Sequence, residues 1–211
     1  MKKITIIDYG CGNILNLSRA IKFIGYEVEV THDHKKIIKS SHTILPGVGA
    51  FGNAMKQLEK YGLPNTIQEY VKLNKPLLGI CLGMQILFTK SYEFGVHKGL
   101  NLIEGEVIKI SNEKNKEIKI PHTGWNTIYP SNDQKEWKNK IVKNSSVEKS
   151  FYFVHSYICI TKDSNLTIAS CDYSGITIPA IVSNNNVFGC QFHPEKSSEE
   201  GLNILKNFCN I

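Results

Sequence analysis

The chain has 211 residues, a length that suits one domain with a sizeable apolar core. Its 25 basic and 19 acidic residues give a formal net charge of +6, but the lysines form no basic tract, which argues against nucleic-acid binding. No apolar run approaches the ~18 residues of a membrane-spanning helix, and the run after Lys3 is too short for a signal peptide.

The first residues predict a strand over 3–8, a loop over 9–13, a helix that ends near Gly25, and a second strand over 27–30. The Gly-x-Gly of this loop resembles a dinucleotide-binding turn. However, Leu15 replaces the third glycine of that fingerprint, and no acidic residue ends the second strand. We therefore expect a tight turn here and no nucleotide cofactor.

A third strand is predicted over 43–45, and it leads into Pro46-Gly47-Val48-Gly49, with helices expected at about 51–61 and 64–73. Glycines let backbone N–H groups face outward and reorient at low cost. Beside a nucleophile, such a loop can form an oxyanion hole. Taken alone, it is more typical of an ordinary Pro-Gly turn between a strand and a helix.

The stretch from Leu77 to Gln85 is the one around which the chain is organised. A short buried strand at 77–80 is followed by a helix expected over 82–90, and Gly79-x-Cys81-x-Gly83 lies between them. This is the spacing of a nucleophile elbow with Cys in place of Ser. The helix N-terminus would favour thiolate over thiol. A buried structural cysteine between two packing glycines would give the same pattern.

The second half is richer in strands. Alternating segments are expected at 103–110, 117–120 and 125–129, a surface loop over 131–150, further strands at 151–160, 166–171, 179–183 and 187–191, and a last helix capped by Ser197 or Ser198. With the strand–helix alternation of the first half, this predicts a three-layer α/β fold formed by a single domain over 1–211.

A second constellation follows the last strand, where His193 and Glu195 stand two residues apart. In an extended chain both side chains point to the same side. An imidazole held by a carboxylate is the base that a cysteine nucleophile needs. His122 and His155 have no such carboxylate.

The six cysteines show no zinc-type spacing, so we expect no metal site and a reducing, cytoplasmic compartment. Several of them, such as Cys159 and Cys190, lie in apolar strand-like segments. Cysteines in such surroundings usually behave as small buried hydrophobes.

Six motifs together give the chain a family resemblance. They are DYGCGN (8–13), PGVGAFGNAM (46–55), GICLGMQILF (79–88), PHTGWN (121–126), YFVHSY (152–157) and QFHPEKS (191–197). In this order the chain resembles the class I (triad-type) glutamine amidotransferases, and among them the glutaminase subunits of imidazole glycerol phosphate synthase. The resemblance implies a flavodoxin-like three-layer sandwich with a central, mostly parallel sheet.

The resemblance also implies a chemistry without any cofactor. Cys81 would attack the side-chain amide of glutamine, with His193 as base and then acid and Glu195 orienting it. The further implied roles are an oxyanion hole at Gly49 and Leu82, glutamine contacts at Gln85, Glu93, Ser156 and Tyr157, and a partner-facing surface at Asn13, His122, Trp125 and Lys196. The partner in the family is a (β/α)8-barrel cyclase subunit, which consumes the released ammonia.

Three alternatives remain open at this stage. A paralogous subunit would donate ammonia to a sugar- or polysaccharide-amidating partner. A stand-alone thiol hydrolase of the same fold would turn over without any partner. A non-catalytic binding protein would keep the fold without the chemistry, but it would be expected to lack one of the three triad residues, and all three are present.

Overall fold

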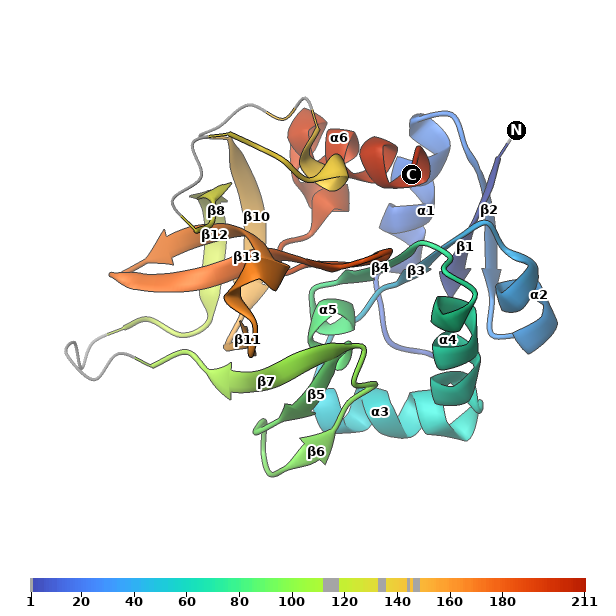
Figure 1. Cartoon of the computed structure of the whole chain (residues 1–211), viewed down its shortest axis with the longest axis horizontal. Coiled ribbons are helices and arrows are strands. Elements are labelled where there is room, and N and C mark those ends of the chain that lie inside the picture. Colours follow the sequence, from blue (N-terminus) through green and yellow to red (C-terminus); the bar gives the residue numbers. More distant parts are fainter. Residues whose placement is uncertain (1, 112–117, 133–135, 144, 146–148) are drawn as a thin grey trace.

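The computed structural model describes residues 2–111, 118–132, 136–143, 145 and 149–211. An eight-stranded sheet crosses the molecule in the order β2-β1-β3-β4-β14-β13-β12-β9, with helices on both faces (Figure 1). The pairings from β2 to β14 are parallel, and those from β14 to β9 are antiparallel. The predicted three-layer α/β fold is confirmed.

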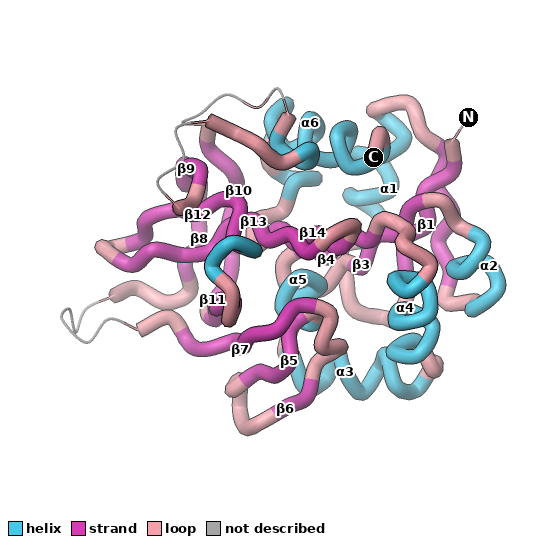
Figure 2. The backbone as a smooth tube through the Cα atoms, viewed as in Figure 1, coloured by secondary structure: helices cyan, strands magenta, loops and turns pink. Residues whose placement is uncertain are grey.

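From β1 to α5 strands and helices alternate, except that two helices, α3 and α4, lie between β3 and β4 (Figure 2). The strands are β1 Lys3–Ile7, β2 Glu27–Thr31, β3 His42–Leu45, β4 Leu77–Ile80, β5 Phe88–Ser91, β6 His97–Lys98, β7 Ile103–Lys109, β8 His122–Thr127, β9 Tyr129–Pro130, β10 Ser150–His155, β11 Tyr157–Thr161, β12 Thr167–Tyr173, β13 Ile176–Asn184 and β14 Val187–Cys190. The helices are α1 Ile14–Phe23, α2 His34–Lys39, α3 Phe51–Lys60, α4 Leu63–Lys72, α5 Leu82–Ile86 and α6 Ser198–Cys209, with 3-10 turns η1 Lys140–Val142, η2 Ser164–Leu166 and η3 Pro194–Lys196.

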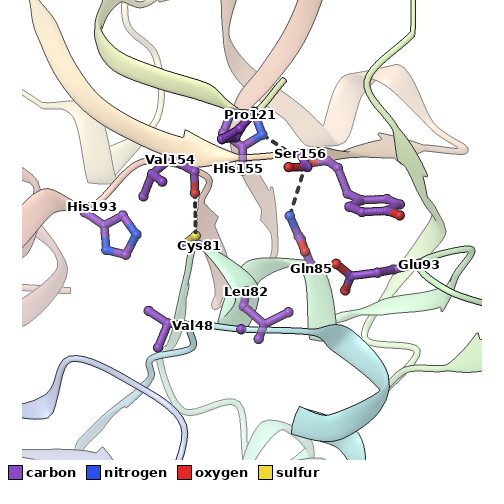
Figure 3. Close-up of a pocket in the computed structure, with 12 residues that line it drawn as sticks. Val48, Cys81, Leu82, Gln85, Glu93, Pro121, Val154, His155, Ser156 and His193 are labelled. Carbon is purple, nitrogen blue, oxygen red and sulfur yellow. Dashed lines mark hydrogen bonds between the residues drawn. The ribbon is translucent and has the colours of Figure 1, made fainter. Parts of the chain in front are cut away.

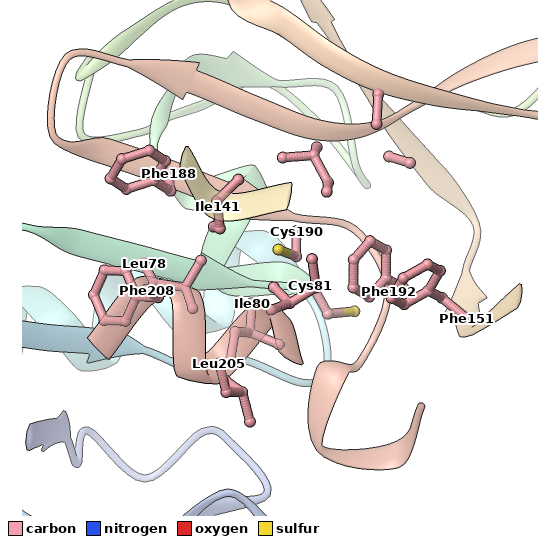
Figure 4. Packing of buried hydrophobic residues seen from close by; sticks show 14 of the residues in the cluster. Leu78, Ile80, Cys81, Ile141, Phe151, Phe188, Cys190, Phe192, Leu205 and Phe208 are labelled. Atoms are coloured by element: carbon pink, nitrogen blue, oxygen red, sulfur yellow. The ribbon is translucent and has the colours of Figure 1, made fainter. Parts of the chain in front are cut away.

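Two apolar clusters fill the space between the layers. Because side chains alternate along a strand, Leu78 packs into the cluster under α1 and α6, whereas Leu77 packs into the one under α3, α4 and α5. Figure 4 shows the first cluster, in which Phe208 and Leu205 of α6 lie against Leu78 and Ile80 of β4. The central strands are therefore buried on both faces, as in other sheets covered by helices on both sides.

Two smaller sheets adjoin the main one. One has the order β11-β7-β5-β6 and lies beside α3 and α5, and the other pairs β8 with β10 (Figure 1). The expected strand over 151–160 is interrupted at Ser156, so that β10 belongs to one of these sheets and β11 to the other. The chain thereby changes direction beside Cys81, and this break supplies one wall of the site described below.

Several predicted elements need correction. The helix predicted over 82–90 ends at Ile86, because the chain turns at once into β5, and helix α2 was not predicted. The described part of 117–120 forms no strand, and residue 117 lies outside the described residues. Ser197 precedes α6 but makes no side-chain cap, since its hydroxyl donates to the His193 carbonyl and accepts from the Tyr152 N–H.

The segment predicted as surface loop over 131–150 includes η1, where Ile141 and Val142 are fully buried. Residues 133–135, 144 and 146–148 of this segment lie outside the described residues. Within the described ranges, no helix has the length and apolar character needed to cross a membrane.

Candidate active site

The parallel strands bring the predicted motifs to one edge of the sheet. The loop 46–49 follows β3, Cys81 follows β4, and the segment from Gln191 to His193 follows β14. Leu45 pairs with Gly79, and Cys190 pairs with Ile80, so the residues after these strands emerge side by side. In open α/β sheets, ligands bind beyond the carboxyl ends of parallel strands.

Cys81 occupies a strained turn between β4 and α5. Its backbone has φ 55° and ψ −110°, a conformation that residues with a side chain rarely adopt. The flanking glycines are required by contact. A Cβ at Gly83 would lie 1.9 Å from the Leu45 carbonyl oxygen, and a Cβ at Gly79 would lie 2.6 Å from the Gly83 carbonyl oxygen. The elbow geometry therefore depends on both glycines.

His193 and Glu195 form a buried pair beside Cys81. Glu195 Oε1 lies 2.9 Å from His193 Nδ1, and each side chain is only 3% exposed. The predicted proximity holds, but for a different reason, because Glu195 lies in turn η3 and not in an extended strand. Burial disfavours the imidazolium, yet the Cys81 sulfur and the Glu195 carboxylate outweigh it and raise the pKa of His193 above its ordinary value, which makes this imidazole a stronger base.

Within the described ranges, the sulfur of Cys81 has two hydrogen-bond partners. It donates to the Val154 carbonyl over 3.8 Å and accepts from Gln191 Nε2 over 3.9 Å. Among the described residues, His193 Nε2 is buried without a hydrogen-bond partner. The thiol of the nucleophile is thus hydrogen-bonded to the Val154 carbonyl, and the imidazole nitrogen that would take its proton has no partner among the described residues.

A pocket of about 310 Å³ opens in front of Cys81, a size that suits a small-molecule ligand. Its lining combines residues from six segments: Val48, Gly49, Cys81, Leu82, Gln85, Glu93, Pro121, Val154, His155, Ser156, Tyr157 and His193. In Figure 3, His193 and Cys81 lie at one end and Glu93 at the other. The structure therefore brings all four predicted glutamine contacts together with the nucleophile and its base.

The loop 46–49 closes the pocket beside the elbow. Tyr9 donates to the Pro46 carbonyl over 2.7 Å, and a Cβ at Gly47 would lie 2.7 Å from the Gly83 nitrogen, so this part of the loop is fixed. Gly49 has φ +100° and open space around it. Neither the Gly49 nor the Leu82 N–H donates to an acceptor within the described part of the chain.

The predicted partner-facing residues do not all share one environment. His122 is only 2% exposed, so its side chain does not reach the surface, and this part of the expectation needs correction. Trp125 is 55% exposed, and Trp125 and Lys196 both lie against the ring of Tyr152. Asn13 lines a small cavity near His193 and Glu195.

His122 instead belongs to a buried hydrogen-bond chain. Its Nδ1 lies 3.0 Å from His155 Nε2, and His155 Nδ1 lies 3.0 Å from the Tyr157 carbonyl oxygen. Burial lowers the pKa of His122 to about 4 and that of His155 to about 3, so both rings are neutral. Since a carbonyl can only accept, His155 carries its proton on Nδ1, and its Nε2 accepts from His122.

Sequence reasoning did not single out several residues of the site. Gln191, Val154 and His155 contact the sulfur or line the pocket, although they stand within the motifs QFHPEKS and YFVHSY. Their roles depend on the break at Ser156 and on the register between β4 and β14, which no local pattern reveals. In the described part of the chain, no cluster of His, Cys, Asp and Glu could hold a metal ion.

Comparison with known proteins places this geometry in context. Residues 5–211 match the family model "Glutamine amidotransferase class-I". Relatives named "Imidazole glycerol phosphate synthase subunit HisH" include one from Bacillus cereus, 47% identical over 99% of this chain and 94% of the relative. Another, from Caldanaerobacter subterraneus subsp. tengcongensis, is 45% identical over 97% of this chain and 96% of the relative.

Solved structures agree on the fold. A glutamine amidotransferase crystal structure superposes with a TM-score of 0.73 at 15% identity, covering 98% of this chain and 99% of the other. PurLQS from Thermotoga maritima gives a TM-score of 0.72 at 20% identity, covering 99% of this chain and 98% of the other.

Proposed function

The chain belongs to the class I glutamine amidotransferases, within the group of HisH subunits, and from this premise we propose that it is the glutaminase subunit of an imidazole glycerol phosphate synthase in histidine biosynthesis. It hydrolyses glutamine to glutamate and ammonia and passes the ammonia to a (β/α)8-barrel cyclase subunit. The observation that carries the proposal is the pocket in which Cys81, His193 and the four expected glutamine contacts meet. We place the reaction in the cytoplasm, which the six unpaired cysteines support.

In the first step, Cys81 transfers its proton to His193 Nε2 and its sulfur attacks the side-chain amide carbon of glutamine. Nε2 is buried, has no partner among the described residues, and belongs to a ring that Glu195 holds through Nδ1. The carboxylate fixes the tautomer and stabilises the imidazolium. His193 then donates the proton to the leaving nitrogen, so that ammonia departs and a glutamyl thioester remains.

In the second step, water hydrolyses the thioester. His193 takes a proton from the water as its oxygen adds to the thioester carbon; the C–S bond of the resulting tetrahedral intermediate then breaks, His193 returns the proton to the sulfur, and glutamate leaves with Cys81 restored. The negative oxygen of each tetrahedral intermediate would be held by the backbone N–H groups of Leu82 and Gly49, which have no competing acceptor within the described ranges.

The pocket also accounts for substrate orientation. Glu93 lies at the end away from His193, where its carboxylate can pair with the α-ammonium group of glutamine (Figure 3). Ser156 and Tyr157 supply polar groups for the α-carboxylate. Gln85 directs its Nε2 to the Tyr157 carbonyl over 3.1 Å, which leaves its Oε1 available to the substrate.

We further propose that the partner controls the rate through the loop 46–49. Gly49 has the positive φ and the free space that a peptide reorientation needs. Losing one oxyanion donor slows acyl transfer by about 10²–10³-fold. Replacing Gly49 with Ala should therefore change the basal rate of glutamine hydrolysis, and unchanged basal and stimulated rates would contradict this gating.

The proposed function is tested by measuring glutamate release from glutamine by the purified chain, alone and with the barrel subunit and its nucleotide. We expect a slow rate alone and a steep rise with the liganded barrel. The matched control is Cys81→Ala, which should abolish glutamine hydrolysis while ammonia-dependent synthesis by the assembled complex survives. Hydrolysis that ignores the barrel would indicate a stand-alone hydrolase, and no hydrolysis in either case would contradict the proposal.

A further inference from the structure

Gln191 is a fully buried polar side chain whose amide reaches the catalytic sulfur. It follows β14 directly, and the register Cys190↔Ile80 places it alongside Cys81, which follows β4. Gln191 Nε2 lies 3.9 Å from Cys81 Sγ, within the distance of a hydrogen bond to sulfur. The mechanism above gives this amide no role, although a buried amide without a purpose would be costly.

The orientation of the Gln191 amide is determined by a chain of hydrogen bonds that begins at the Tyr157 carbonyl. That oxygen can only accept, and Gln85 Nε2 lies 3.1 Å from it, so the Gln85 amide must point its nitrogen there. The same nitrogen lies 3.2 Å from Gln191 Oε1 and donates to it. Gln191 is therefore held with its oxygen toward Gln85 and its nitrogen toward Cys81.

We propose that Gln191 is a catalytic residue of the glutaminase reaction, an amide donor held against Cys81 Sγ that stabilises the sulfur in its anionic, attacking form. The inference rests on the proposed function for its consequence in catalysis, but the donor itself is a property of the free chain. Hydrogen bonds to charged acceptors are stronger than those to neutral ones, so this donor favours thiolate over thiol.

The two partners of the sulfur respond in opposite ways when its proton leaves. The Val154 carbonyl accepts from the thiol, and it has nothing to accept once the proton has moved to His193. Gln191 Nε2 remains a donor in both states and gains strength when the sulfur becomes negative. Deprotonation therefore moves the balance of contacts from Val154 to Gln191 and His193.

Apart from His193, the titratable groups around the sulfur do not supply this stabilisation. They are His155, Tyr9, Cys159 and Glu93. Burial lowers the pKa of His155 and raises the pKa of Tyr9 and of Cys159, so these three stay neutral, and Glu93 is a carboxylate at the far end of the pocket. Among the described side chains around the sulfur, this leaves His193 and Gln191 to offer it a proton or positive charge.

The test is the rate at which iodoacetamide alkylates Cys81, followed by mass spectrometry as a function of pH without glutamine. Gln191→Met keeps a similar volume but removes the donor, and Gln191→Glu keeps the shape but puts an acceptor beside the sulfur. We expect both to alkylate Cys81 about tenfold more slowly at neutral pH and to shift the titration upward, the Glu variant more. Gln68→Met, outside the site, is the matched control, and Cys81→Ala gives the background.

A second measurement on the unaltered chain covers the case in which these variants fail to fold. The side-chain amide protons of Gln191 should shift in the NMR spectrum as Cys81 titrates, and they should stay still over the same pH range in Cys81→Ala. Alkylation rates equal to those of the control in folded variants, or amide protons that ignore the sulfur, would overturn the inference. Since neither readout needs glutamine, a failure of the proposed function would leave both results unaffected.

Discussion

Glu93 both accepts a hydrogen bond at the start of a helix and lines the pocket, and a pair of substitutions can separate the consequences of these two contacts. Helix α3 begins at Phe51, and Ala50 at its N-cap provides no side-chain cap. The cap comes instead from the turn after β5, where Glu93 Oε2 accepts the Phe51 N–H. The same carboxylate lines the pocket in front of Cys81. We therefore predict that Glu93→Ala weakens both the fold and glutamine binding.

The expected loss of stability follows from the contact that disappears. A hydrogen bond to a charged group contributes about 1.5–3 kcal/mol, and the helix N-terminus adds about 0.3–1 kcal/mol for a negative charge. Since Glu93 is part-buried, we expect Glu93→Ala to reduce the free energy of unfolding by about 2 kcal/mol. Glu93→Gln keeps an acceptor but loses the charge, and it should cost about half as much.

A second substitution, at the N-cap of α3, should restore the stability that Glu93→Ala loses. Ala50 has the extended backbone of an N-cap residue, so Ala50→Asp can accept an N–H of the first turn and should return about 1 kcal/mol. Urea unfolding of the single and double variants measures the stability, and KM for glutamine measures the binding. We expect the double variant to recover stability and not KM. Recovery of both, or unaltered stability in Glu93→Ala, would refute the double role.

Three further predictions concern other parts of the chain. Because the pKa of His155 falls from 6.5 to about 3 on folding, the unfolded chain binds a proton that the folded chain refuses, and stability decreases as the pH drops from 6.5 toward 3. In His155→Gln, the free energy of unfolding should therefore decrease less on acidification, and the difference from the unaltered chain should reach about 2 kcal/mol near pH ~5. Gly83→Ala brings a Cβ to within 1.9 Å of the Leu45 oxygen and should lower stability by about 4 kcal/mol or more in urea, whereas Gly175→Ala, with open space, should cost about 1 kcal/mol. Because the ring of Trp125 is 55% exposed, Trp125→Ala should change the free energy of unfolding by no more than about 0.5 kcal/mol. The same variant should weaken the stimulation of glutamine hydrolysis in a titration with the barrel partner.

Local patterns predict what depends on neighbours in the sequence. The strand before Cys81 and the two glycines around it follow from a buried apolar run and from steric limits, and the structure has both. The end of α5 at Ile86 could not be predicted in this way, because apolar residues continue past it. Only the pairing of β5 with β7 determines that these residues form a strand and not a longer helix. Contacts across the sheet lie beyond any local pattern.

The same distinction holds within the site. His193 and Glu195 are close in sequence, so their pairing was predictable, although the backbone that achieves it is a 3-10 turn. The Gln191 contact with Cys81 depends on strands that are far apart in the chain. His122 was expected at the surface, and only the pairing of β8 with β10 places its ring next to His155, where the structure buries it.

Two features of the structure could slow glutamine hydrolysis by the free subunit, and the sizes of their effects on the rate differ. The first is the contact between the Cys81 thiol and the Val154 carbonyl, a weak donor at 3.8 Å. Breaking it costs less than an ordinary hydrogen bond, about 0.5–1.5 kcal/mol, which slows the reaction by no more than about tenfold. The second is the orientation of the Gly49 peptide. One misplaced oxyanion donor costs about 2.7–4 kcal/mol, or 10²–10³-fold. We therefore propose that a partner that stimulates glutamine hydrolysis by more than about tenfold acts on the loop 46–49, because the resting position of the sulfur accounts for about tenfold at most.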